Sequence, residues 1–336
     1  MRVLIARLDN LGDVLLAGPA VRAVAERADE VVLLCGPRGR DAAELLPGVD
    51  RVLEWCAPWI DPEPAPVENA HVDRLVRDVR ALAADRALIF TSFHQSPLPL
   101  ALLLRLAGVP WIGGISDDYP GSLLDLRYRQ EGEIPEPARM VELAAAAGFP
   151  ARNGDTRLRV REPLPDVRAL TGGPDYVVVH PGTSVPARAW PPDRCAAAVR
   201  LLAAAGRRVV VTGHRAEKDL TARVAGRDGI DLGGRTCLPE LAAVLAGAAA
   251  VVAGNTGPAH LAAAVGTPVV SLFAPTVPAA RWAPHGVPVV LLGDQRAPCA
   301  DTRAKECPVP GHPCLASVRP GDVVAAVDGL TEEVAA

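Results

Sequence analysis

Short apolar runs alternate along the chain with longer amphipathic stretches that are rich in alanine and leucine. Val3–Ala6 precedes the stretch Val14–Arg27, and Glu30–Leu34 precedes Arg40–Leu45. Runs of this length are typical of buried strands, and the longer stretches have the apolar spacing of helices. Strands that alternate with helices form parallel sheets with right-handed crossovers, so the pattern predicts an α/β fold.

The same alternation continues to the end of the chain. The further predicted strands are Val52–Glu54, Ala87–Phe90, Trp111–Gly113, Tyr176–His180, Arg208–Thr212, Val251–Ala253 and Val269–Phe273. The further predicted helices are Leu75–Ala84, Pro97–Ala107, Arg139–Gly148, Asp193–Ala205, Ala216–Val224, Leu238–Ala246, Pro258–Val265 and Asp322–Leu330.

Proline and glycine interrupt the pattern over residues 150–175, apart from one alternating segment, Arg157–Val160, that favours an edge strand. We therefore predict a first domain over residues 1–160, a linker over 161–175 and a second domain over 176–320. The last helix and tail, residues 321–336, can pack against either half. Two such halves predict a cleft at the carboxyl ends of their strands.

Composition narrows the class of protein. Apolar residues make up 49% of the 336 residues and charged residues 22%, as in a globular protein, and the net charge of −4 disfavours binding to nucleic acid. The start of the chain lacks the long apolar core of a signal peptide, and Leu98–Val109 is too short to span a bilayer. We expect a cytoplasmic protein with at most peripheral membrane contact.

The stretch 251–276 has the form strand, tight turn, helix, strand. Its turn is Gly254-Asn255-Thr256-Gly257, followed by Pro258, which suits the first turn of a helix. A helix N-terminus presents unpaired N–H groups and a positive dipole end to an anion such as a diphosphate. An ordinary connecting turn fits the same spacing, so both interpretations stay open here.

Other candidate residues follow strands of the two halves. Asp13 lies where the helix after the first strand begins, as a helix cap or as a general base. Thr183, Ser184 and Arg188 follow the first strand of the second half and are suitable donors to phosphate oxygens. With the loop Thr212–Glu217, these loops come from the same strand ends and can converge. No P-loop or G-x-G-x-x-G spacing is present.

Three cysteines and a histidine near the end of the chain form the one candidate metal site. Cys299, Cys307 and Cys314, with His312 between the last two, match zinc in ligand type. Their x7 and x6 spacings do not match zinc sites, which carry C-x2–4-C pairs. A loop of reduced thiols is therefore the favoured interpretation, and no metal site is predicted.

The assembled loops resemble the heptosyltransferase family, glycosyltransferase family 9. The similar segments are LDNLGDVLLAGPAV (residues 8–21), HPGTSVPARAWPPDR (180–194), TGHRAEKDL (212–220) and GNTGPAHLAAAVGTPVVSLFAPT (254–276). The resemblance implies a GT-B architecture of two Rossmann-like domains, the first binding the acceptor and the second a nucleotide-sugar. It also implies inverting transfer of a heptose, usually from ADP-heptose, without a cofactor or a tightly bound catalytic metal.

The resemblance further implies roles for single residues. Asp13 matches the catalytic base, and Thr183 and Ser184 match residues that bind the donor diphosphate. Arg188 stands where the family has a phosphate-binding lysine, and Glu217 matches the acid that binds the ribose hydroxyls. The family's D-[TS]-G-x-x-H turn corresponds to the remaining donor residues: Asn255, Thr256, Gly257 and His260.

Two departures from the family pattern bear on the substrates. Asn255 replaces an aspartate that contacts the donor sugar, so it carries no charge and leaves the donor sugar open. The segment Glu54–His71 has four acidic residues, no lysine or arginine, and two tryptophans that either stack on a sugar or pack the loop. These charges predict a neutral or cationic acceptor, such as a glycoside or an aminocyclitol natural product.

Two alternatives to a glycosyltransferase are a nucleotide-sugar 2-epimerase of the same architecture and a non-catalytic nucleotide-sugar binding protein. An epimerase turns over its nucleotide-sugar with no acceptor present, whereas a binding protein releases no product. Asp13 in its loop disfavours the binding protein.

Overall fold

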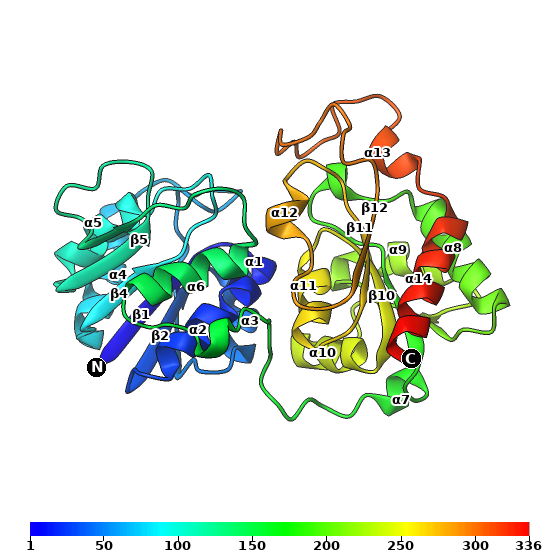
Figure 1. Ribbon diagram of the computed structural model, residues 1–336, viewed down its shortest axis with the longest axis horizontal. Coiled ribbons are helices and arrows are strands. Elements are labelled where there is room, and N and C mark those ends of the chain that lie inside the picture. Colours follow the sequence, from blue (N-terminus) through cyan, green and yellow to red (C-terminus); the bar gives the residue numbers. More distant parts are fainter. Residues whose placement is uncertain (336) are drawn as a thin grey trace. The chain divides into compact units, whose positions relative to one another are not determined.

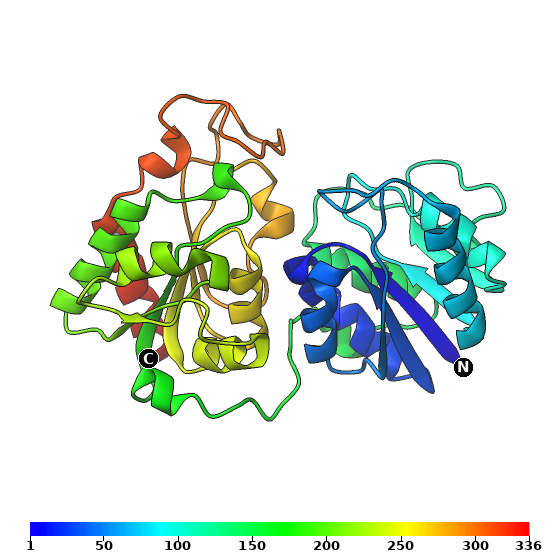
Figure 2. The same cartoon turned by 180° about the vertical axis from the view of Figure 1, so that it is seen from behind.

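The computed structural model describes residues 1–335, which divide into two compact units, Met1–Arg161 and Glu162–Ala336. Each unit contains one six-stranded parallel sheet with helices on both faces (Figures 1 and 2). The α/β fold class is therefore confirmed.

The first unit is built around a sheet of strand order β3-β2-β1-β4-β5-β6. Its strands are β1 Arg2–Arg7, β2 Glu30–Cys35, β3 Arg51–Glu54, β4 Arg86–Ile89, β5 Trp111–Ile115 and β6 Leu126–Tyr128. Its α-helices are α1 Leu11–Leu16, α2 Gly18–Ala25, α3 Arg40–Leu45, α4 Asn69–Leu82, α5 Leu98–Leu106 and α6 Glu136–Ala146, with 3-10 turns η1 Pro37–Gly39 and η2 Arg152–Gly154. Buried side chains of α4 and α5 form a core with β1, β2 and β4, and α2 packs against α6.

The second unit has the order β12-β11-β10-β7-β8-β9. Its strands are β7 Tyr176–His180, β8 Val209–Val211, β9 Ile230–Asp231, β10 Ala248–Gly254, β11 Val269–Leu272 and β12 Val289–Leu292. Its α-helices are α7 Arg168–Thr171, α8 Pro192–Ala204, α9 Lys218–Ala225, α10 Leu238–Ala246, α11 Gly257–Ala264, α12 Ala279–Trp282, α13 Pro313–Ala316 and α14 Pro320–Ala335, with 3-10 turns η3 Pro186–Arg188 and η4 Arg215–Glu217.

The C-terminal helix belongs to the second unit. Val323, Val327 and Leu330 of α14 are buried in one core with α8 residues such as Leu202. Every third or fourth residue of α14 is apolar at this face, so the helix covers the sheet beside α8. Figure 1 shows α14 alongside α8.

Two expectations from the sequence were wrong. Residues 157–160 do not form a strand. Leu158 and Val160 are buried, but the carbonyl of Arg157 accepts from the Arg22 side chain, and the N–H of Arg161 donates to Leu45. The alternation therefore reflects an extended segment that lies on the first unit without a partner strand. The helix expected over Val14–Arg27 is broken at Ala17 into α1 and α2, because Gly18-Pro19 begins a new helix.

Candidate functional site

In each unit the strand order reverses between the first and the fourth strand. β1 lies beside β4, and β7 lies beside β10. Ligands of open α/β sheets bind at the carboxyl ends of the strands at such a switch point. The candidate residues of each unit lie in the loops that follow these strands.

Asp13 lies at the third position of α1, immediately after β1. Its Oδ2 accepts a hydrogen bond from the backbone N–H of Asn10, the residue before the helix, at 3.2 Å. Its Oδ1 accepts from Nη2 of Arg7 at 3.1 Å. A carboxylate in the first turn also complements the positive end of the helix dipole. These contacts fix the carboxylate at the carboxyl end of β1.

Arg7 is the charged group that organises this end of the first sheet. Its side chain is fully buried as the last residue of β1. Its Nη2 also donates to Oγ of Ser92 at 3.0 Å, and its Nε lies 3.2 Å from Oδ2 of Asp9. The Gln95 amide donates to Asp9 in turn. A buried guanidinium is stable only with acidic partners, and Asp9 and Asp13 supply them.

The surroundings of Asp13 favour a proton acceptor that works near neutral pH. Burial raises its pKa, the neighbouring Asp9 raises it further, and Arg7 lowers it, which leaves a pKa of about 6. The carboxylate is therefore ionised above about pH 6, yet more basic than an exposed aspartate.

A second buried ion pair lies beside this network and was missed in the sequence. Glu136 of α6 is fully buried, and its Oε2 accepts from Nη1 of Arg139 at 3.1 Å. The same nitrogen donates to the carbonyl of Thr91 at 2.5 Å, in the loop after β4. Glu136 also raises the pKa of Arg7. On an alanine-rich helix, an i,i+3 Glu–Arg pair looks like a solvent-exposed one.

In the second unit, the loop after β7 is held tightly on itself. The Thr183 hydroxyl accepts from the Val185 N–H at 3.2 Å, and Ser184 is exposed. At the end of β7, Nδ1 of the buried His180 lies 2.9 Å from the Thr212 hydroxyl at the end of β8. Burial lowers the pKa of His180 to about 4, so this histidine is neutral.

Glu217 closes over the same loop from the other side. Its Oε2 accepts from the His214 N–H at 2.7 Å, which places the carboxylate above Gly182. A Cβ at Gly182 would lie 2.1 Å from Oε1 of Glu217, so only glycine allows this approach. The loops after β7 and β8 therefore meet at Gly182 and Glu217.

The turn after β10 contains two buried polar side chains. Asn255 is 6% exposed and His260 is 4% exposed. Nδ2 of Asn255 and Nδ1 of His260 have no hydrogen-bond partner among residues 1–335. Burial, followed by the charge of Arg188, lowers the pKa of His260 to about 4. Between them, Thr256 directly precedes α11, whose first residue is Gly257, and its hydroxyl donates to the Gly254 carbonyl at 3.3 Å. Buried polar atoms without a partner in the first turn of a helix are suited to a polar ligand.

Arg188 connects this turn with the loop after β11. Its Nε lies 3.4 Å from the hydroxyl of the buried Thr276. A Cβ at Gly254 would lie 3.2 Å from the carbonyl of Arg188, so the two loops touch through their backbones. The structure thus brings Arg188, His260, Gly254 and Thr276 together, and it joins Glu217 to the His180 loop.

The cysteine-bearing loop lies on the same end of the second sheet. The N–H of Ala187 donates to the carbonyl of Lys305 at 2.9 Å, and that of Arg303 to the carbonyl of Thr276 at 2.8 Å. Cys299 and Cys314 are buried in the core of the second unit, and all seven cysteines are free. Among the described residues, no group of histidine, cysteine or acidic side chains is arranged to hold a metal ion.

A family model described as Glycosyltransferase family 9 (heptosyltransferase) matches residues 72–312. Lipopolysaccharide heptosyltransferase 1 of Pseudomonas aeruginosa is 30% identical over 304 residues, which cover 81% of this chain and 78% of that protein. Lipopolysaccharide heptosyltransferase 3 of Escherichia coli is 33% identical over 107 residues, but the match spans only 32% of that relative's length and 30% of this chain.

The fold is likewise similar to a solved one. The structure of the E. coli ADP-heptose lps heptosyltransferase II covers 100% of both chains with a TM-score of 0.75 at 19% identity. This likeness supports the GT-B type of fold. Within residues 1–335, none of the helices has both the length and the apolar character needed to cross a membrane.

Proposed function

This chain belongs to glycosyltransferase family 9, the heptosyltransferase family, and is a glycosyltransferase; from that premise we propose that it transfers a heptose from ADP-heptose to a hydroxyl of a saccharide or glycoside acceptor. The observation that carries the proposal is Asp13, which is 17% exposed beside the buried Arg7 and whose pKa of about 6 suits a general base. A solved relative of the same fold is described as an ADP-heptose enzyme.

The proposed reaction is a direct displacement with inversion. The acceptor hydroxyl gives its proton to Asp13 as its oxygen attacks the anomeric carbon, and the bond from that carbon to the diphosphate breaks. ADP leaves with the bonding electron pair. Arg7 donates to Oδ1 of Asp13, so it holds the carboxylate in one orientation through the reaction.

The second unit supplies the proposed donor site. The negative charge that grows on the departing diphosphate is stabilised by the positive charge of Arg188. The hydroxyls of Thr183 and Ser184 and the N–H groups at the start of α11 stabilise it as hydrogen-bond donors. Glu217 accepts hydrogen bonds from the ribose hydroxyls. Asn255 has a buried, unpaired Nδ2, which is suited to donate to a hydroxyl of the donor sugar, and His260 has an unpaired Nδ1 nearby on α11.

We further propose a neutral or cationic acceptor. Trp55 is 2% exposed, stacks on His71 at 4.8 Å and contacts Trp59 at 5.4 Å, so it packs the loop and is not a sugar platform. Arg38 lies 3.6 Å from Asp61 and 3.8 Å from Glu63, and Arg40 lies 3.4 Å from Glu54. The guanidinium groups next to this segment are therefore already paired with its acidic side chains, which supports an acceptor without negative charge.

Product analysis with ADP-heptose tests the reaction. The wild type should form a heptosylated product only when an acceptor is present, whereas Asp13→Asn should form none and still bind ADP. Conversion of the nucleotide-sugar without acceptor would indicate an epimerase, and donor binding without any product would indicate a binding protein. Undiminished turnover by Asp13→Asn would remove Asp13 from its role.

Two comparisons of substrates test the remaining assignments. The melting temperature is measured with ADP-, GDP-, UDP- and TDP-sugars in turn, and it should rise with the ADP-sugar. A rise only with UDP- or TDP-sugars would overturn the assignment of ADP-heptose as the donor. Matched acceptors with and without a phosphate should favour the unphosphorylated one. Preference for the phosphorylated acceptor would overturn the proposal on its charge.

A further inference from the structure

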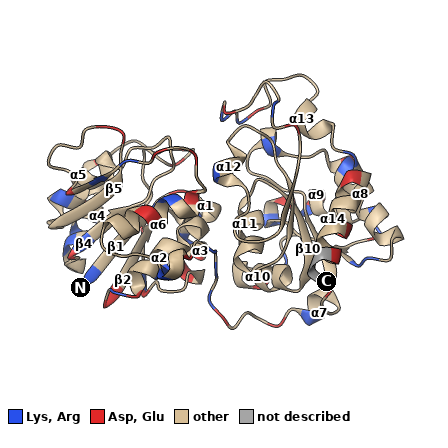
Figure 3. Cartoon of the chain, in the orientation of Figure 1, with Lys and Arg blue, Asp and Glu red and all other residues tan. Residues whose placement is uncertain are grey.

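A cavity of the first unit is lined by four arginines. It has a volume of about 930 Å³ and lies between α2, the loop Pro47–Gly48 and the segment 151–159. Basic and acidic residues are interspersed over both units (Figure 3), but four arginines face only two acids here. The lining residues that carry charge are Arg22, Arg152, Arg157, Arg159, Glu26 and Asp155.

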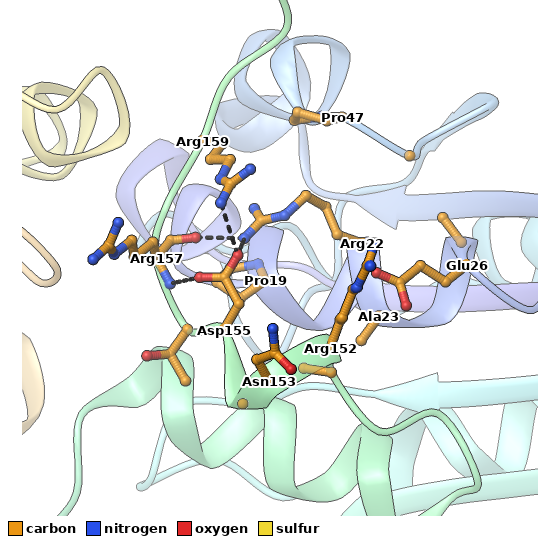
Figure 4. A pocket seen from close by; sticks show the side chains of 15 residues that line it. Pro19, Arg22, Ala23, Glu26, Pro47, Arg152, Asn153, Asp155, Arg157 and Arg159 are labelled. Atoms are coloured by element: carbon orange, nitrogen blue, oxygen red, sulfur yellow. Dashed lines mark hydrogen bonds and ion pairs between the residues drawn. The ribbon is translucent and has the colours of Figure 1, made fainter.

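The acids of the cavity do not neutralise its arginines. Asp155 pairs with Arg22 at 3.4 Å and with Arg159 at 3.0 Å (Figure 4). Arg152 and Arg157 have no ion pair with an acid in the described part of the chain. The cavity therefore has an excess of two positive charges, in a protein whose net charge is −4. Such a concave surface concentrates anions.

Arg22 adds a donor that the protein itself does not use. Its side chain is 17% exposed, and its Nη2 donates to the carbonyl of Arg157 at 2.6 Å. Its buried Nη1 has no hydrogen-bond partner among residues 1–335. Burial lowers the pKa of Arg22, and Asp155 opposes this effect. An anion in the cavity would stabilise this partly desolvated guanidinium through its charge, without needing a hydrogen bond from the buried Nη1.

The lining also indicates what accompanies the anion. None of the described lining residues is aromatic, so the cavity has no aromatic ring on which a nucleobase could stack. Asn153 and Thr156 supply neutral polar groups beside the arginines. The volume is in the range of pockets for small organic ligands and exceeds what a free phosphate needs. These features favour a sugar that carries phosphate.

The cavity lies away from the candidate base. The chain runs from α2 into the amino end of β2, and Pro47–Gly48 precede the amino end of β3, whereas Asp13 follows the carboxyl end of β1. In a parallel sheet these are opposite edges. Along the chain, the lining residues 155–159 lie just before Arg161, the last residue of the first unit.

We propose that this cavity is a binding site for a phosphorylated saccharide, separate from the proposed site of sugar transfer. The arginines bind the phosphate, and the polar side chains of the 151–159 segment bind sugar hydroxyls. The proposal does not depend on which sugar the enzyme transfers.

Calorimetric titration of the full-length protein with glucose 6-phosphate tests the site. We expect binding to the wild type that weakens with added salt and persists when ADP is saturating. Glucose should not bind, and inorganic phosphate should bind more weakly than glucose 6-phosphate. Arg152→Gln/Arg157→Gln should weaken the binding roughly tenfold or more, because it removes two charged donors from exposed positions where folding is not at risk.

Arg168→Gln/Arg227→Gln is the matched control, because both arginines are highly exposed and lie in the second unit. This variant should bind glucose 6-phosphate like the wild type, and both double variants should bind ADP normally. The proposal is overturned if glucose 6-phosphate does not bind, if ADP displaces it, or if inorganic phosphate binds as tightly. Equal affinities in the two double variants would overturn it as well.

Discussion

At the scale of single residues, the proposed role of Asp13 as the general base makes the transfer rate depend on its protonation. Its pKa of about 6 lies above the ordinary value of 3.8 because the side chain is largely desolvated and Asp9 is close. We therefore expect the transfer rate, measured against pH at saturating donor, to fall tenfold per unit below about pH 6. A rate that stays constant down to pH 4 would show that another group accepts the proton.

The same pKa predicts how Asp13 affects stability. The folded state binds the proton more tightly than the unfolded chain, so the favourable contribution of protonation is present below pH 3.8 and is lost as pH rises through about 6. The shift in pKa between the unfolded and the folded state corresponds to on the order of 3 kcal/mol in the free energy of unfolding.

Asp13→Asn keeps the group neutral, so near neutral pH this variant should melt at a higher temperature than the wild type. The difference between the two melting temperatures should disappear as the pH falls toward 4, where Asp13 of the wild type is protonated as well. A lower melting temperature of the variant near neutral pH would mean that the ion pair with Arg7 outweighs the cost of burying the carboxylate.

Gly182 gives a prediction about the donor site. In Gly182→Ala the new Cβ would meet the Glu217 carboxylate, so Glu217 must leave its position over the loop. We expect weaker binding of ADP by calorimetry, with the fold retained because the clash is with a side chain. Gly321→Ala, where nothing lies near the new Cβ, is the matched control. Unchanged ADP affinity in Gly182→Ala would show that Glu217 does not bind the ribose hydroxyls.

The sequence revealed these residues unevenly. Asp13, Thr183 and Arg188 could be selected because each follows a predicted strand, which is where parallel sheets bind ligands. The burial of Arg7 could not be predicted, because an arginine at the end of an apolar run usually marks where the strand reaches solvent. Its partners Ser92 and Glu136 are distant along the chain, and only the folded sheet brings them together.

At the scale of elements, the packing of α14 against α8 gives a stability prediction. Leu202 of α8 is fully buried in the core that α14 completes, whereas its neighbour Leu201 is 46% exposed. Leu202→Ala should lower the free energy of unfolding by roughly 2–5 kcal/mol, and Leu201→Ala by much less. Denaturant melts of the two variants provide the measurement, and equal losses would contradict this account of the core.

Most strands were predicted within a residue or two, since buried parallel strands appear as short apolar runs. The expected bounds of β7 and α10 agree with the structure at both ends. β6, β9 and β12 were missed. β6 and β9 are short and only partly buried, and β12 follows a proline-rich stretch that resembles a loop. In such edge strands the pairing with a neighbour, rather than burial, defines the strand.

At the scale of the whole molecule, each unit has its own core. The proposed donor residues, from Thr183 to His260, all belong to the unit that begins at Glu162. A fragment of residues 162–336 should therefore fold and bind ADP with an affinity close to that of the full chain, while catalysing no transfer. Circular dichroism and calorimetry provide the measurements. A folded fragment that does not bind ADP would place essential donor contacts in the first unit.

The two sheets have the same strand order when the strands of each unit are counted from its own first strand. The loop that holds Asp13 then occupies the place that the Thr183 loop occupies in the other half. The loop of Ser92 likewise corresponds to that of Asn255. This is the common doubly wound order, so the fold offers the same two loops at the carboxyl edge of each sheet. The chain has equipped the two equivalent edges differently: one holds an ion-paired carboxylate, and the other holds the neutral buried side chains of Asn255 and His260.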